Sequence, residues 1–192
     1  MIHEYSLTDF ATRYGLLDHA IFDILAAFPR SWIAGGALRA FVEGRPITTD
    51  VDFFFRNDKE YKDFVDYLVD DRVSETASNT TFKTLVNGIE YKIQAINLAV
   101  YPTLVDCLES FDFTICMLGT DGDRLYAGEY TLFDIARKRL AVNRITYAAA
   151  SVRRLLKYAA QGYTACQGCI VQMLEAVVEN PGVIQSTVAY VD

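Results

Sequence analysis

Two aspartates, Asp50 and Asp52, stand one residue apart at the start of an apolar run that ends at Phe55. In a strand, residues i and i+2 project from the same face, so we expect the two carboxylates to lie side by side. Adjacent carboxylates repel each other, and divalent cations such as Mg²⁺ or Mn²⁺ relieve that repulsion by binding the oxygens. The pair therefore predicts a metal site, where two ions would stabilise both oxygens of a phosphoryl transfer. The alternative is an ordinary solvent-facing pair after the turn residues Thr48 and Thr49.

A pair of glycines, Gly35 and Gly36, precedes these aspartates. The apolar run 32–34 before them predicts a short strand, and residues 37–43 predict a helix that Gly44 ends. The glycines then lie at a strand-to-helix turn, where backbone N–H groups can approach an anion closely. The segment predicts a phosphate cradle.

Thirteen residues separate Gly36 from Asp50, and this arrangement resembles the signature of the nucleotidyltransferase superfamily. The closer resemblance is to the head domain of tRNA CCA-adding enzymes and bacterial poly(A) polymerases. The matching stretches are Gly35-Gly36-Ala37-Leu38-Arg39-Ala40, Gly44-Arg45-Pro46 and Asp50-Val51-Asp52. The spacer is one residue longer than in that family, and Ala40 stands where the family has an acid. The resemblance implies that Gly35, Gly36 and Arg39 bind phosphate oxygens.

A second segment, residues 111–118, is similar to the family's Arg-Arg-Asp-Phe-Thr-Ile-Asn-Ala-Leu strand. The resemblance makes Asp112 the third catalytic and metal-binding carboxylate, beside Asp50 and Asp52. Ser110 and Phe111 replace the paired arginines, and Cys116 replaces the asparagine. An acid that caps a buried strand is the alternative interpretation of Asp112.

A third segment, residues 151–163, resembles the family's neck motif on a helix. Arg154 and Lys157 occupy two of its basic positions and Ser151 occupies the third. Residues three apart share a helix face, so both cations can face one triphosphate or a nucleic-acid backbone. The alternative is a solvated basic stripe on an amphipathic helix.

The resemblance implies an α+β nucleotidyltransferase (DNA polymerase β-like) fold, a mixed sheet of about five strands with helices on one side, followed by a helical neck. We expect residues 1–130 to form the head domain and residues 131–192 to form the neck and C-terminal segment. At 192 residues the chain is long enough to bury about 70% of its unfolded surface. No apolar run reaches the roughly 20 residues of a membrane helix, so we expect a cytoplasmic protein without membrane partners.

Local patterns predict the remaining elements. Ser6 and Asp9 predict a helix start, and an apolar stripe from Leu17 to Phe28 predicts that this helix continues to Pro29. Asn87-Gly88 predicts a tight hairpin between strands 81–86 and 89–96. Apolar residues 61, 64, 65 and 68 have helical spacing and predict a helix. Residues 104–109 predict a helix weakly. We expect a buried strand at 112–118 and helices from about 132 to 179.

The charge distribution bears on partners. The net charge of −7 argues against a general nucleic-acid binder. Between Arg124 and Lys157, however, eight Lys or Arg residues accompany only two acids, Glu129 and Asp134. Such a basic segment could hold a short or single-stranded RNA end more readily than a long duplex.

The four cysteines and two histidines carry little signal. Cys166 and Cys169 have the spacing of a metal or redox motif, but a structural zinc site needs four ligands. The only histidines are His3 and His19. We expect ordinary structural roles for these residues.

The resemblance implies Mg²⁺-dependent or Mn²⁺-dependent transfer of an NMP from an NTP, such as ATP, to an acceptor hydroxyl, with release of pyrophosphate. An RNA 3′ end is the preferred acceptor. The alternatives are transfer to a protein or small molecule, and a catalytically inactive binding or assembly module of the same fold. The sequence leaves the NTP, the acceptor and the oligomeric state open.

Overall fold

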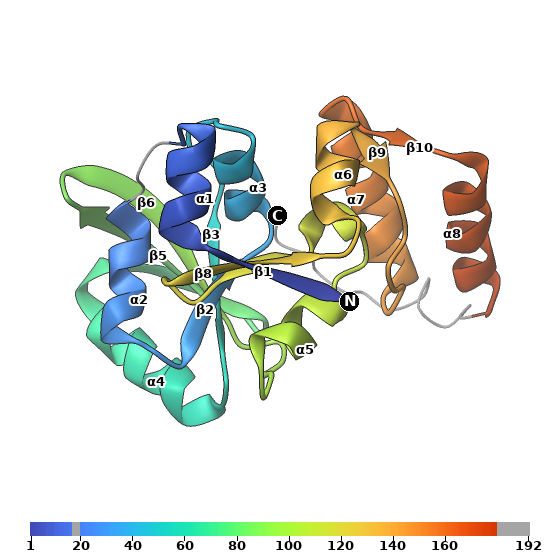
Figure 1. Cartoon of the computed structure of the whole chain (residues 1–192). Coiled ribbons are helices and arrows are strands. Elements are labelled where there is room, and N and C mark those ends of the chain that lie inside the picture. Colours follow the sequence, from blue (N-terminus) through green and yellow to red (C-terminus); the bar gives the residue numbers. More distant parts are fainter. Residues whose placement is uncertain (17–19, 180–192) are drawn as a thin grey trace.

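The computed structural model describes residues 1–16 and 20–179 (Figure 1). Within these residues the head is an α+β unit built on one mixed sheet of eight strands, in the order β1-β8-β7-β2-β3-β6-β5-β4. The strands are β1 (Ile2–Ser6), β2 (Ser31–Ala34), β3 (Val51–Phe55), β4 (Arg72–Glu75), β5 (Asn79–Val86), β6 (Ile89–Ile96), β7 (Leu118–Thr120) and β8 (Arg124–Gly128). The helices of the head are α1 (Leu7–Tyr14), α2 (Asp23–Ala27), α3 (Gly36–Val42), α4 (Asp58–Tyr67) and α5 (Leu104–Glu109).

The sheet is buried on both faces because its central strands carry apolar residues on each face. Phe53 and Phe55 of β3 lie in the core cluster that α1 to α4 cover. Phe54, with Trp32 of β2, belongs to a second cluster with Leu108 of α5. The predicted fold class is thus confirmed, but the sheet has more strands than the five expected. One helix, α5, also covers the face that was expected to lack helices.

The N-terminal segment differs from the single helix that we predicted. Ser6 does cap α1, accepting a hydrogen bond from the backbone N–H of Asp9 (3.2 Å). The helix ends at Gly15, which has φ of +61° and closes the last turn. A 3₁₀ turn (Ala20–Phe22) and the short α2 follow. Leu17, the first residue of the predicted stripe, lies outside the described residues.

Local signals elsewhere were accurate. Asn87 and Gly88 both have positive φ (50° and 80°) and join β5 to β6, as the hairpin signal predicted. The helix predicted from residues 61–68 is α4, and the weak helix at 104–109 is α5. Residues 121–123 join β7 to β8.

The predicted strand at residues 112–118 is wrong for most of its length. Phe113 forms only an isolated bridge to Val142, and a 3₁₀ turn, η3 (Thr114–Cys116), precedes β7. Every residue of this run is buried, and a continuous apolar run does not distinguish a strand from a buried turn. Asp112 therefore precedes a turn and is not on a sheet strand.

The chain after β8 is largely helical, as predicted, and Figure 1 shows its helices grouped beside the head. The helices are α6 (Thr131–Ala136), α7 (Ala148–Ala160) and α8 (Gln167–Glu179). Two short strands, β9 (Arg139–Leu140) and β10 (Thr164–Ala165), were not anticipated and pair in parallel. Because α6 contacts η3 and β8 of the head, a boundary at residue 131 would cross packed structure, and the two-domain division stays a prediction. No helix among the described residues is long and apolar enough to span a membrane.

Candidate functional site

The two glycines form the turn between β2 and α3. Gly35 has φ of +87° and ψ of −132°, a conformation open essentially to glycine alone. Its N–H donates to the carbonyl of Leu118 (2.9 Å), which anchors the turn to β7. A Cβ on Gly35 would lie 4.0 Å from Asp52 Oδ2 and 3.9 Å from the ring of Phe111. The predicted cradle and the second aspartate are therefore neighbours.

Asp52 lies on β3, directly opposite Ala34 of β2. Its carboxylate is partly buried, and no described residue donates a hydrogen bond to it or pairs with it as an ion. Burial, followed by the charge of Asp50, raises the pKa of Asp52 to about 7. An ionised Asp52 is thus poorly compensated by the protein alone, as expected for a carboxylate that binds a cation.

Asp50 precedes β3 and is held by two residues of the neighbouring strand β6. Lys92 Nζ lies 3.0 Å from Asp50 Oδ1, and Gln94 Nε2 donates to Oδ2 at 2.7 Å. We did not identify either residue from the sequence. Lys92 and Gln94 do alternate with apolar residues in the sequence, but nothing local shows that β6 pairs with β3.

Asp112 is only 6% exposed and accepts a hydrogen bond from Arg154 Nη1 of α7 (2.8 Å). The described residues contain no group of three or more His, Cys, Asp or Glu side chains arranged to hold a metal ion. The structure thus does not bring Asp112 together with Asp50 and Asp52 as a three-carboxylate ion site. Its position before a turn, with a cation of the neck beside it, accounts for the difference.

The neck contributes positive charge to the site. Lys157 and Arg154 on α7 both act to lower the pKa of Asp52, opposing burial and Asp50, which raise it. The positive charges of the two predicted basic residues therefore reach Asp52. Arg154 is already paired with Asp112, whereas Lys157 is exposed and forms no ion pair with a described residue.

Two further positions of the motifs are buried. Ser151 is 1% exposed. Arg39 is 5% exposed, donates to Gln161 Oε1 (2.9 Å) and stacks over the rings of Tyr158 and Tyr163. Arg39 therefore packs between α3 and the neck, and its predicted phosphate contact stays a prediction.

The cysteines lie away from the aspartates or are buried. Cys116, at the family's asparagine position, is 3.0 Å from the hydroxyl of Tyr158, and burial raises the pKa of its thiol to about 11. Cys166 is exposed and Cys169 is buried, and all four cysteines are free. His3 is exposed on β1, and His19 lies outside the described residues.

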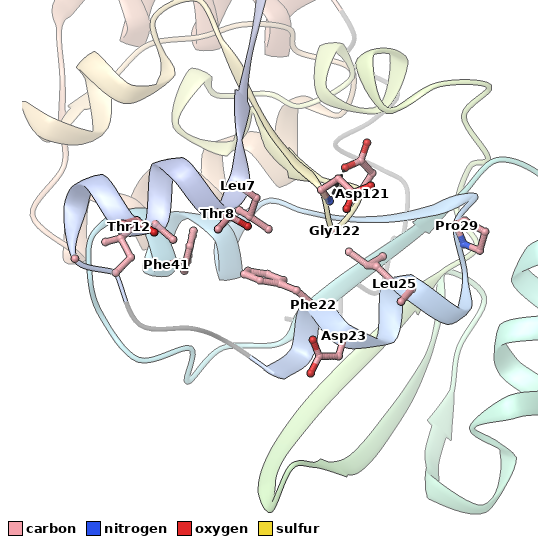
Figure 2. A pocket seen from close by; sticks show the side chains of 15 residues that line it. Leu7, Thr8, Thr12, Phe22, Asp23, Leu25, Pro29, Phe41, Asp121 and Gly122 are labelled. Atoms are coloured by element: carbon pink, nitrogen blue, oxygen red, sulfur yellow. Dashed lines mark hydrogen bonds between the residues drawn. The ribbon is translucent and has the colours of Figure 1, made fainter.

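A cavity of about 910 Å³ lies elsewhere, between α1, α2 and the β7–β8 turn (Figure 2). Leu25, Phe41 and Gly122 are among the residues that line it. The β7–β8 turn follows Thr120, which pairs with Ile33 of β2. The glycine turn follows Ala34, at the opposite end of that pairing, so the cavity and the glycine turn lie at different ends of the sheet. None of the described residues lining this cavity is a predicted site residue.

The donor set of the site fits a hard divalent cation. Two carboxylates adjoin, and one of them has no partner in the described protein. With the glycine turn against Asp52 and the charge of Lys157 acting on it, the arrangement can hold a cation together with the phosphates of a nucleotide. The described side chains do not provide the third carboxylate ligand that we predicted.

Several solved structures share this fold. The Thermotoga maritima CCA-adding enzyme complexed with tRNA superimposes with a TM-score of 0.65 at 14% identity, over 95% of this chain and 47% of that one. A CCA-adding enzyme in complex with CTP has a TM-score of 0.67 at 14% identity, over 96% of this chain and 47% of that chain. The Bacillus stearothermophilus CCA-adding enzyme in complex with CTP has a TM-score of 0.55 at 15% identity, over 88% of this chain and 45% of that chain. These likenesses confirm the nucleotidyltransferase fold, and the chain spans about half of each of these structures.

Sequence comparison identifies a different group of relatives. A protein of Bacillus phage SPbetaL7, described as Gabija anti-defense 2, is 30% identical over 135 residues, which is 69% of this chain and 33% of that protein. The chain therefore spans about a third of this curated relative. The model of the Gabija anti-defense 2 family matches residues 3–138. Because this match covers more than half of the residues of this chain, the chain belongs to the Gabija anti-defense 2 family.

Proposed function

We propose that this protein is a metal-dependent nucleotidyltransferase that transfers an NMP from an NTP to an acceptor hydroxyl. The observation that carries the proposal is the isolated carboxylate of Asp52, which lies beside Asp50, against the glycine turn and within reach of the charge of Lys157. A fold alone does not establish chemistry. The proposal rests instead on this group of side chains, which can bind a cation and phosphates as phosphoryl transfer requires.

In this proposal Asp50 and Asp52 hold Mg²⁺ or Mn²⁺, and the ion supplies charge stabilisation at the phosphate oxygens. Gly35 and Gly36 let the backbone approach the phosphates closely. Lys157 contributes charge to the triphosphate, and Arg154 orients Asp112 at the edge of the site. The acceptor oxygen bonds to the α-phosphorus as the bond to pyrophosphate breaks, and the hydroxyl proton passes to water.

An RNA 3′ end is the acceptor that we favour. The charges of Arg154 and Lys157 in the neck act on Asp52, and one solved structure of the same fold is a complex with tRNA. Lys157 is exposed and is therefore available to contact a phosphate of the RNA. The division into a catalytic head and a nucleic-acid-contacting neck is part of this proposal.

The family name suggests a setting for the reaction. We propose that the transfer counteracts the Gabija defence, through an RNA or through a protein or small molecule of that system. A catalytically inactive module that binds its target is the second candidate. One observation favours it: both oxygens of Asp50 already have partners within the protein.

The test is transfer of α-labelled nucleotide. The protein is incubated with each labelled NTP, Mg²⁺ or Mn²⁺, and separately with small RNAs, with Gabija proteins and with neither. Label on RNA supports the preferred acceptor, and label on a protein or small molecule identifies the alternative. If no NTP is consumed while the protein still counteracts Gabija in cells, the binding module replaces the enzyme.

A further inference from the structure

We propose that Lys92 and Gln94 replace the second cation and the third carboxylate of this site, so that it holds a single divalent ion. The inference rests on the proposed function, since it concerns the same aspartates. It assigns a positioning role to two residues of β6 that the sequence motifs do not include.

The sheet register places these two residues beside the aspartates. β6 runs parallel to β3, with Ile93 opposite Val51 and Gln94 opposite Asp52. Side chains two residues apart share a face of a strand, so Lys92 and Gln94 project on the face that carries Asp50 and Asp52. Gln94 thus places an amide, and not a third carboxylate, at the sheet position opposite Asp52.

The contacts show what the two side chains do. Gln94 is 7% exposed and donates to Oδ2 of Asp50, while Lys92 Nζ lies 3.0 Å from Oδ1 and 3.2 Å from Oδ2. The charge of the ammonium group also acts on Asp52, where it lowers the pKa. Lys92 thus supplies a fixed positive charge at Asp50, and this charge also acts on Asp52.

A second divalent ion at Asp50 would have to share a carboxylate oxygen with this ammonium group. A divalent ion and an ammonium group that share one oxygen would repel each other strongly, and this repulsion is greater where solvent is partly excluded. Asp52, by contrast, has no partner among the described residues. One ion bound mainly by Asp52 therefore satisfies the charge of that carboxylate without displacing Lys92 from Asp50.

The experiment counts bound ions without relying on catalysis. Mn²⁺ is titrated into the full chain in the absence of nucleotide, and free Mn²⁺ is measured by electron paramagnetic resonance. We expect one Mn²⁺ per chain for the wild type. Lys92→Met should bind Mn²⁺ about tenfold more tightly because the competing charge is gone. Lys92→Met combined with Gln94→Glu should bind a second Mn²⁺.

Lys62→Met is the matched control, since it removes the same charge from an exposed position on α4. Circular dichroism and melting temperature establish that each variant is folded. Two Mn²⁺ ions on the wild type, or an equal effect of Lys62→Met and Lys92→Met, would overturn the inference. Absence of any Mn²⁺ binding would overturn it together with the metal-dependent function. One bound ion without transfer from any NTP would support it while rejecting the transferase.

Discussion

Arg154 of the neck donates a 2.8 Å hydrogen bond to Asp112, a buried carboxylate of the head that is 42 residues away in sequence. Arg154 and its neighbour on α7, Lys157, both act on Asp52, where their charges lower the pKa. The ion pair therefore fixes the neck helix α7 relative to the candidate site. Its position suggests that stability of the head–neck contact and geometry of the site depend on the same two residues.

A double-mutant cycle tests this ion pair. Removing Arg154 by substitution to Met leaves Asp112 buried without its partner, so we expect a loss of about 1 to 2 kcal/mol of unfolding free energy, allowing for the partial exposure of Arg154. Asp112→Asn should cost less in the Arg154→Met background than in the wild type. Urea unfolding provides the measurement. The exposed pair Lys59 and Asp63 of α4 is the control and should show no measurable coupling.

Asp52→Asn should stabilise the metal-free protein at high pH. Because burial and Asp50 raise the pKa of Asp52 to about 7, its contribution to stability is complete below the pKa of the unfolded chain and is lost as pH rises through 7. The variant should therefore gain about 2 to 4 kcal/mol over the wild type at pH 8 and almost nothing at pH 4.

Thermal melts from pH 4 to 8 provide this measurement, with exposed Asp66→Asn on α4 as the control. Addition of Mg²⁺ should raise the melting temperature of the wild type and not that of Asp52→Asn, and the same variant should lose nucleotide transfer. Equal stabilisation by Mg²⁺ in both proteins would remove Asp52 from the ion site.

Glu43 should show the opposite pH dependence. Burial acts to raise its pKa, but hydrogen bonds from Lys138, Arg45 and Tyr163 outweigh burial and lower it. A lowered carboxylate pKa contributes stability at neutral pH that is lost as pH falls through the folded-state value. Glu43→Gln should thus cost about 1 to 3 kcal/mol at pH 7, and the difference from wild type should shrink below about pH 4.

Melting temperatures across that range test the assignment of Glu43. The exposed Glu90→Gln on β6 makes the same chemical change without these partners and should have little effect. A constant difference between wild type and Glu43→Gln at all pH values would mean that packing, and not charge, accounts for its contribution.

The two glycines allow a matched comparison. Gly35→Ala forces a side chain into a backbone conformation with φ of +87°, so we expect a loss of about 1 to 3 kcal/mol in stability. A Cβ on Gly36 meets nothing within 4 Å, so Gly36→Ala should fold normally. If a phosphate lies against this turn, Gly36→Ala should weaken nucleotide binding, measured by calorimetry, without lowering the melting temperature. Unchanged affinity in a folded Gly36→Ala protein would argue against the cradle.

Short-range features were predictable from the sequence because they depend on neighbours in the chain. The Gly35 turn, the cap of Ser6 on α1 and the Asn87-Gly88 hairpin each follow from the backbone preferences of one or two residues. The resemblance of three motifs to CCA-adding enzymes led to the correct fold. The break at Gly15 was missed because the apolar stripe appeared to continue past it.

The composition of the site was decided by tertiary structure. That β3 pairs with β6, and thereby brings Lys92 and Gln94 to Asp50, depends on a register between strands about forty residues apart. The position of Asp112 depends on a buried turn whose apolar sequence resembles a strand. The sequence by itself determined the residues that can bind an ion and a phosphate. Only long-range packing determined which charges adjoin them, because hydrophobic burial constrains which residues lie inside far more strongly than which strands lie side by side.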